Sequence, residues 1–176
     1  MTETVGYYRG QLESSWSTET RHVACNPPKG TPLSFGQCVV ASCALLPRLQ
    51  HEFPNETFKI STGKILKSDA ESMPLRSLND TGHAWIDWQR DTFADVSVID
   101  VTADQVEDAY LRSQLFVVAT HDLLAEKGIV YSTRRGYPDT ETLLLHSDKK
   151  DPGEVRNRLE ILENNLERQL VKRQNH

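Results

Sequence analysis

The sequence is poor in the features that mark membrane, secreted and nucleic-acid-binding proteins. No stretch approaches the roughly 20 consecutive apolar residues that span a bilayer. Residues 1–17 are polar and lack the apolar segment of a signal peptide. The net charge of −5 differs from the basic footprint of nucleic-acid binders. We therefore expect a cytoplasmic protein that binds neither nucleic acid nor membranes.

Cysteine is also scarce, with three residues in a chain of 176: Cys25, Cys38 and Cys43. An odd number without a secretion signal argues against a disulfide framework. The sequence has neither a Cys-x-x-Cys motif nor the paired histidine spacing of a zinc site. No metal and no cofactor is therefore predicted.

An apolar helix is predicted over residues 34–46. Ser34 is a good N-cap, and Gln37 three residues later completes a capping box. Apolar residues follow on nearly every side of this helix, so it is expected to be buried. Pro47 is expected to end or kink it. Cys38 falls in the first turn.

Two alternating segments, at 82–88 and 95–101, predict neighbouring strands. The residues between them form a loop of hairpin length. A symmetric hairpin sets Trp85 opposite Val98 and His83 opposite Asp100. Opposed residues share a face of the sheet at about 5 Å between Cβ atoms. Asp100 is therefore expected to reach the imidazole of His83.

Shorter patterns complete the expected fold. Strands are expected at 57–60, 64–66, 115–119, 129–132 and 143–145, helices at 5–12, 104–111 and 122–127, and loops at 61–63 and 68–81. Together, these elements predict an α+β domain over residues 1–152, in which a buried N-terminal helix packs on an antiparallel sheet.

A separate amphipathic helix is predicted at the C-terminal end, within 153–176. Its apolar stripe comprises Val155, Leu159, Leu162 and Leu166, and the opposite face is charged. Exposing four such side chains would cost several kcal/mol, at about 1.5–3 kcal/mol each. The stripe must therefore dock on its own domain or pair with a second chain in a short coiled coil. The homodimer is favoured, because the helix follows a break at Asp151-Pro152.

The order cysteine, histidine, aspartate is one that a thiol nucleophile, its base and an orienting carboxylate can take. At a helix start, the unpaired amides favour the Cys38 thiolate. A protonated His83 nearby would favour it further. Asp100 would fix the tautomer of His83 and stabilise its charge.

Three further residues are candidates for oxyanion or substrate binding. Gly36 lets the backbone approach a substrate carbonyl. Gln37 could add a side-chain donor, but not while it closes the capping box. Trp85 lies two residues from His83, although packing is the commoner role of a strand tryptophan.

At these residues the chain resembles the papain-like superfamily, in its transglutaminase-like branch. The matching positions are Cys38, His83-Ala84-Trp85 and Asp100-Val101-Thr102. Small bacterial members also resemble it in Gly36-Gln37-Cys38 and in the Asp-x-Thr-x-x-Gln of residues 100–105. The likeness covers roughly residues 30–106. It implies a papain-like fold and a cysteine peptidase or glutamine-type amidase that acts on a peptide or protein amide.

Two alternatives remain open. The same fold can serve as a non-catalytic binding or assembly module, in which Cys38 would be an ordinary, slowly reacting thiol. A metal-dependent hydrolase would have to draw its ligands from scattered histidines. These are His22, His51, His121 and His146.

Overall fold

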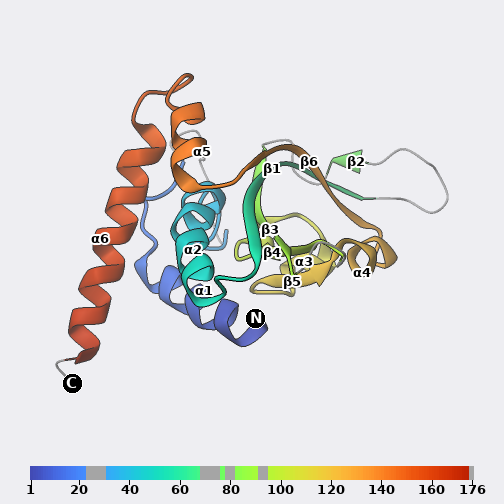
Figure 1. Cartoon of the computed structure of the whole chain (residues 1–176), viewed down its shortest axis with the longest axis horizontal. Coiled ribbons are helices and arrows are strands. Elements are labelled where there is room, and N and C mark those ends of the chain that lie inside the picture. Colours follow the sequence, from blue (N-terminus) through green and yellow to red (C-terminus); the bar gives the residue numbers. More distant parts are fainter. Residues whose placement is uncertain (23–30, 68–75, 78–81, 91–94, 175–176) are drawn as a thin grey trace.

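The computed structural model describes residues 1–22, 31–67, 76–77, 82–90 and 95–174. In these residues it contains six strands, six α-helices and one 3-10 turn (Figure 1). The strands are β1 (Thr57–Lys67), β2 (Arg76–Ser77), β3 (His83–Gln89), β4 (Ser97–Asp100), β5 (Val117–Thr120) and β6 (Ile129–Tyr137). The helices are α1 (Thr2–Ser15), α2 (Cys38–Glu52), α3 (Ala109–Arg112), α4 (His121–Glu126), α5 (Thr140–Ser147) and α6 (Glu154–Gln174), and the 3-10 turn is η1 (Ala103–Gln105). No helix in the described ranges is long and apolar enough to cross a membrane.

The strands form one antiparallel sheet. Their order is β2-β1-β3-β4-β5, and β6 pairs with β1. Strand β1 pairs with β3 through residues 57–63 and with β6 through residues 60–67. The expected α+β class with an antiparallel sheet is therefore confirmed.

Helix α2 is the buried helix that the apolar pattern predicts. It packs against β1 and β3 on one side and against α6 on another, and Figure 1 shows it between the sheet and α6. Leu45, Leu46 and Leu49 are at most 1% exposed and share a core with Ile60 and Ile86 of the sheet. A second cluster, which includes Trp85, is built mainly from β3–β6, α3 and α4.

The start of α2 differs from the expected capping box. The helix begins at Cys38, and Gln37 occupies the N-cap without a side-chain cap bond. Residues 33–36 form a turn instead, in which Gly36 takes a φ of 76°. This left-handed backbone favours glycine. The Gln37 side chain donates to the carbonyl of Ser17 at 3.1 Å, so a tertiary contact replaces the cap.

Pro47 does not end α2, and the carbonyl that it frees still has a hydrogen-bond donor. A proline in a helix removes the hydrogen bond to the carbonyl four residues earlier, here that of Cys43. The hydroxyl of Thr140, at the start of α5, donates to this carbonyl at 3.0 Å. The helix therefore continues to Glu52.

The pairing of β3 with β4 is shifted by two residues from the symmetric hairpin. Asp87 lies opposite Val98, where the expected register placed Trp85. One further step along this register sets Asp100 opposite Trp85 and diagonal to His83. A shift of two keeps every side chain on its expected face. In the structure β4 begins at Ser97 rather than at Asp95.

Three other expectations need correction. The turn expected at 61–63 is part of a continuous β1, opposite a bulge at Arg134 of β6, where a Cβ on Gly63 would lie 2.0 Å from the carbonyl oxygen of Ser132. The strand expected at 143–145 is part of α5, because Asp139 caps the amide of Thr142 at 2.7 Å. The helix expected at 104–111 divides into η1 and α3. The loop expected at 68–81 lies almost wholly outside the described residues.

Helix α6 docks on its own chain, against α1 and α2. Its stripe is covered there: Val155, Leu162 and Leu166 are 6%, 0% and 3% exposed, and Leu159 is partly buried. The docked alternative therefore replaces the favoured coiled coil for this stripe. Leu170 and Val171 remain exposed. A homodimer through the C-terminal helix stays a prediction.

We expect Leu162→Ala to destabilise the protein by about 2–5 kcal/mol, because it opens a cavity where α6 meets the core. Leu170→Ala, on the exposed end of the same helix, should change stability by less than about 0.5 kcal/mol. Urea denaturation with light scattering measures both effects. Equal small effects of the two variants, or a loss of dimer with Leu162→Ala alone, would contradict docking within one chain.

Candidate active site

Cys38 is the first residue of α2 and is 9% exposed. The amides of a first helical turn have no partner within the helix, so they stabilise negative charge at this end. Cys43 lies deeper in the same helix, where burial raises the pKa of its thiol to about 12. Cys25 lies outside the described residues. Of the two described thiols, Cys38 alone stands at the helix start.

His83 opens β3, and its ring is held by Asp100 at the end of β4. The imidazole Nε2 lies 2.7 Å from Asp100 Oδ2, and neither side chain is exposed to solvent. The contact that the sequence predicts therefore forms, although the register differs from the expected one. Diagonal neighbours on one face of a sheet are close enough for long side chains to meet.

Both carboxylate oxygens of Asp100 accept further hydrogen bonds. Oδ1 accepts from the Thr102 amide at 2.9 Å and from the Thr102 hydroxyl at 3.0 Å. Oδ2 accepts from the Tyr131 hydroxyl at 2.9 Å. Burial alone would raise the pKa of Asp100, but the charge of His83 and these hydrogen bonds hold it below its usual value of 3.8. Asp100 is therefore an ionised carboxylate with every oxygen satisfied.

The charges around His83 favour its protonated form. Burial would lower its pKa, yet the charge and hydrogen bond of Asp100 raise the pKa to about 10. Burial would raise the pKa of the Cys38 thiol, but a hydrogen bond from His83 and its charge lower it. Because Asp100 holds Nε2, we assign the hydrogen bond between His83 and Cys38 to Nδ1. The arrangement can therefore support a thiolate and an imidazolium side by side.

Gln105, at the end of η1, also belongs to the site. Its Oε1 accepts from the Gly36 amide at 2.9 Å, and its Nε2 lies 3.1 Å from Nδ1 of His83. The sequence carried a signal for it, since Gln105 ends the Asp-x-Thr-x-x-Gln motif. Tyr131 had no such signal, because β6 joins the site only through the sheet.

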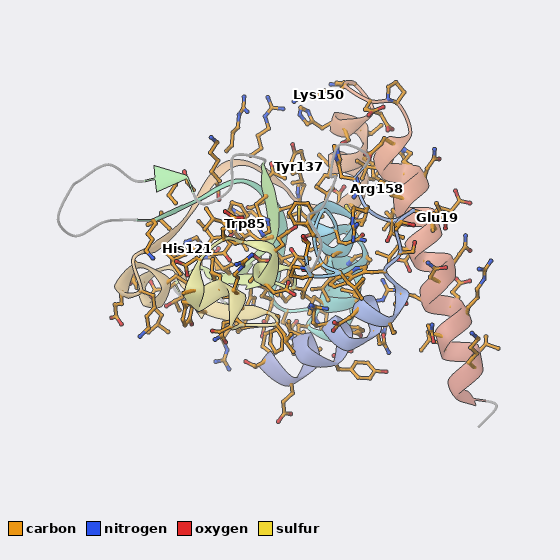
Figure 2. The ribbon with its side chains drawn as sticks, turned by 180° about the vertical axis from the view of Figure 1, so that it is seen from behind. Glu19, Trp85, His121, Tyr137, Lys150 and Arg158 are labelled. Atoms are coloured by element: carbon orange, nitrogen blue, oxygen red, sulfur yellow. The ribbon has the colours of Figure 1, made fainter. Side chains whose placement is uncertain are left out.

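The turn before Cys38 is fixed by contacts from distant segments. The Gly36 carbonyl accepts from the His22 amide at 3.1 Å and from Arg158 Nη2 at 2.8 Å. Arg158 belongs to α6, is 4% exposed, and lies on the side of α2 that faces α6 (Figure 2). Gln37 is fully buried. Both Gly36 and Gln37 thus hold the turn rather than presenting free donors.

Trp85, a candidate for substrate binding, has no exposed surface. Its ring stacks on His83 at 6.3 Å between centroids and meets Tyr131 edge-on at 5.1 Å. Its indole N–H donates to Asp87 at 2.8 Å. In this structure Trp85 supports the imidazole from within the core, and its expected role in substrate binding stays a prediction.

The histidines of the metal alternative do not converge. His121 lies 3.7 Å from Asp87, and His146 contacts Arg135. In the described ranges, no three histidine, cysteine, aspartate or glutamate side chains group in a way that could hold a metal ion. Figure 2 shows His121, the first residue of α4, apart from Arg158 and α6.

Comparison with known proteins finds no relative: no family model, no curated protein and no solved structure matches the chain. The arguments that follow therefore rest on the geometry of the site itself.

We expect Asp100→Asn to destabilise the protein by about 3–5 kcal/mol near neutral pH, because it leaves His83 buried without its countercharge. A raised histidine pKa stabilises the folded state below about 6.5, and this contribution is lost as the pH rises through about 10. The lowered pKa of Asp100 contributes above about 3.8 and is lost on acidification. The difference in the free energy of unfolding between the variant and the wild type should therefore narrow at both ends of the pH range.

Chemical denaturation across pH measures this difference. Asp122→Asn, an exposed substitution of the same kind in α4, is the control and should be nearly neutral at every pH. If the loss of unfolding free energy in Asp100→Asn stays constant from acid to alkaline pH, the charge of Asp100 is not coupled to His83.

Proposed function

We propose that this protein carries out thiol-dependent acyl chemistry on an amide, as a cysteine peptidase or a glutamine-type amidase. Cys38 is the nucleophile, His83 is the base and then the acid, and Asp100 orients and stabilises the imidazole. The observation that carries the proposal is the 2.7 Å contact between His83 and the buried carboxylate of Asp100, coupled to the thiol at the start of α2.

The reaction follows from these positions. The Cys38 thiolate attacks the amide carbonyl carbon and forms a C–S bond, while the first-turn amides of α2 stabilise the oxyanion. As the C–N bond breaks, protonated His83 gives its proton to the leaving amine. His83 then takes a proton from water, which attacks the thioester and regenerates Cys38. An amine in place of this water would give transfer rather than hydrolysis.

The fold supports a papain-like assignment in the transglutaminase-like branch, which is part of the proposal. The nucleophile precedes the sheet on a buried helix, the histidine opens β3, and the aspartate ends β4. This order matches the branch that the motifs resemble. A peptide or protein amide is accordingly the proposed substrate.

One observation favours the non-catalytic alternative. His83 and Asp100 are each 1% exposed, and Cys38 is nearly as buried. A binding module on this fold would keep the same network as a structural core, and its thiol would react slowly. Reactivity of Cys38 therefore separates the two functions.

We expect Cys38 to be the most reactive thiol below neutral pH, and to form an acyl adduct with an activated acyl ester. Limiting iodoacetamide followed by peptide mass mapping measures the first property, and intact-protein mass measures the second. Cys38→Ser should abolish both signals, and Cys43→Ser should leave them unchanged. Preferential labelling of Cys25 or Cys43, or no adduct in the wild type, would instead support the binding module.

A further inference from the structure

Gln105 bridges the turn before the nucleophile and the ring of the base. The residue is 9% exposed. Its Oε1 lies 2.9 Å from the Gly36 amide nitrogen, and its Nε2 lies 3.1 Å from Nδ1 of His83. Both contacts come from one amide group, so the orientation of that group decides what each end can do.

The orientation is fixed by the backbone. The Gly36 N–H is a donor and needs an acceptor, which among the two ends of the Gln105 amide is only Oε1. The NH₂ end is thereby directed at His83. An NH₂ group can donate but cannot accept, so the hydrogen bond forms only if Nδ1 carries a lone pair.

This requirement selects one form of the imidazole. With Nδ1 unprotonated, the single ring proton sits on Nε2 and points to Asp100, in agreement with the 2.7 Å contact. Protonation of Nδ1 would bring an N–H against the NH₂ of Gln105 at 3.1 Å. Gln105 therefore favours the neutral ring, whereas Asp100 favours the cation. The two residues act on His83 in opposite directions.

Resting on the proposed function, we propose that Gln105 is a positioning residue. Its NH₂ group favours the Nε2–H tautomer of the neutral ring and opposes the imidazolium that Asp100 favours, and so it restrains formation of the Cys38 thiolate until the amide is displaced. The restraint is tied to the Gly36 turn, because the same amide is anchored there. Movement of this turn would release Nδ1 to accept the thiol proton.

Four ionisable groups bear on this equilibrium among the described residues. Cys38 of α2 interacts with the imidazole, and Asp100 of β4 faces Nε2. Tyr131 of β6 donates to Asp100, and Asp104 of η1 also interacts with Asp100 electrostatically. In the described part of the chain, the Gln105 amide bonds to Gly36 and His83 and to none of these four groups, so replacing that amide changes one interaction at His83 directly.

The direct test is the pH profile of Cys38 alkylation in Gln105→Glu. The carboxylate can still accept from Gly36, and it replaces the opposing NH₂ by an acceptor for Nδ1–H. We expect the alkylation midpoint to fall by about one pH unit, which is roughly tenfold faster labelling on the acid side of the profile. Gln114→Glu, the same charge change on another segment, should leave the midpoint unchanged.

A midpoint that is unchanged or higher in folded Gln105→Glu overturns the proposal, because a residue that only supports the ring could not accelerate the thiol. His83→Gln separates this result from failure of the proposed function. If His83→Gln leaves the Cys38 profile unaltered, the thiol and imidazole are not coupled, and the catalytic pair itself is wrong.

A measurement on the wild type needs no substitution. Nitrogen NMR of histidine-labelled protein distinguishes the two neutral tautomers of His83. The proposal predicts a proton on Nε2 and none on Nδ1 in the neutral ring. The Nδ1–H tautomer would overturn it even if Gln105→Glu failed to fold.

Discussion

The candidate site depends on the buried carboxylate of Asp100. An ionised carboxylate in a protein interior carries a desolvation cost of several kcal/mol, which only a complete set of partners can offset. Here the partners come from three places: His83 on β3, Thr102 just after β4, and Tyr131 on β6. Each carboxylate oxygen has two such partners, so the loss of one leaves a buried charge with fewer hydrogen bonds to offset its desolvation. The sheet that carries β3, β4 and β6 therefore also supplies the partners that offset the desolvation cost of the Asp100 carboxylate.

The second constraint is the turn that delivers Cys38 to the sheet. The positive φ of Gly36 lets the chain enter α2 abruptly, and both polar groups of its peptide backbone are bonded to remote segments. Arg158 reaches this turn from α6, and Gln105 reaches it from η1. The C-terminal helix thus does more than cover the core, because it helps to set the position of the nucleophile. Stability and the geometry of the site are coupled through this one peptide unit.

Several elements followed from local patterns, and the failures have identifiable causes. The alternation in β3 and β4 predicted which side chains share a face, and that result survived a register shift of two residues. The predicted capping box does not form, because the Gln37 side chain donates to the Ser17 carbonyl instead. Pro47 did not end α2, since Thr140 supplies the donor that the freed carbonyl needs. Each failure reflects a contact between residues far apart in the chain.

The sequence by itself determined the α+β class, the buried helix, and the shared sheet face of His83 and Asp100, because hydrophobic periodicity acts locally. Tertiary structure decided the rest. It assigned Trp85 to the core, recruited Tyr131 and Arg158, and placed the amide of Gln105 between Gly36 and His83. It also folded the leucine stripe of α6 onto its own chain. Such contacts depend on distances between side chains that only the packed sheet and helices establish.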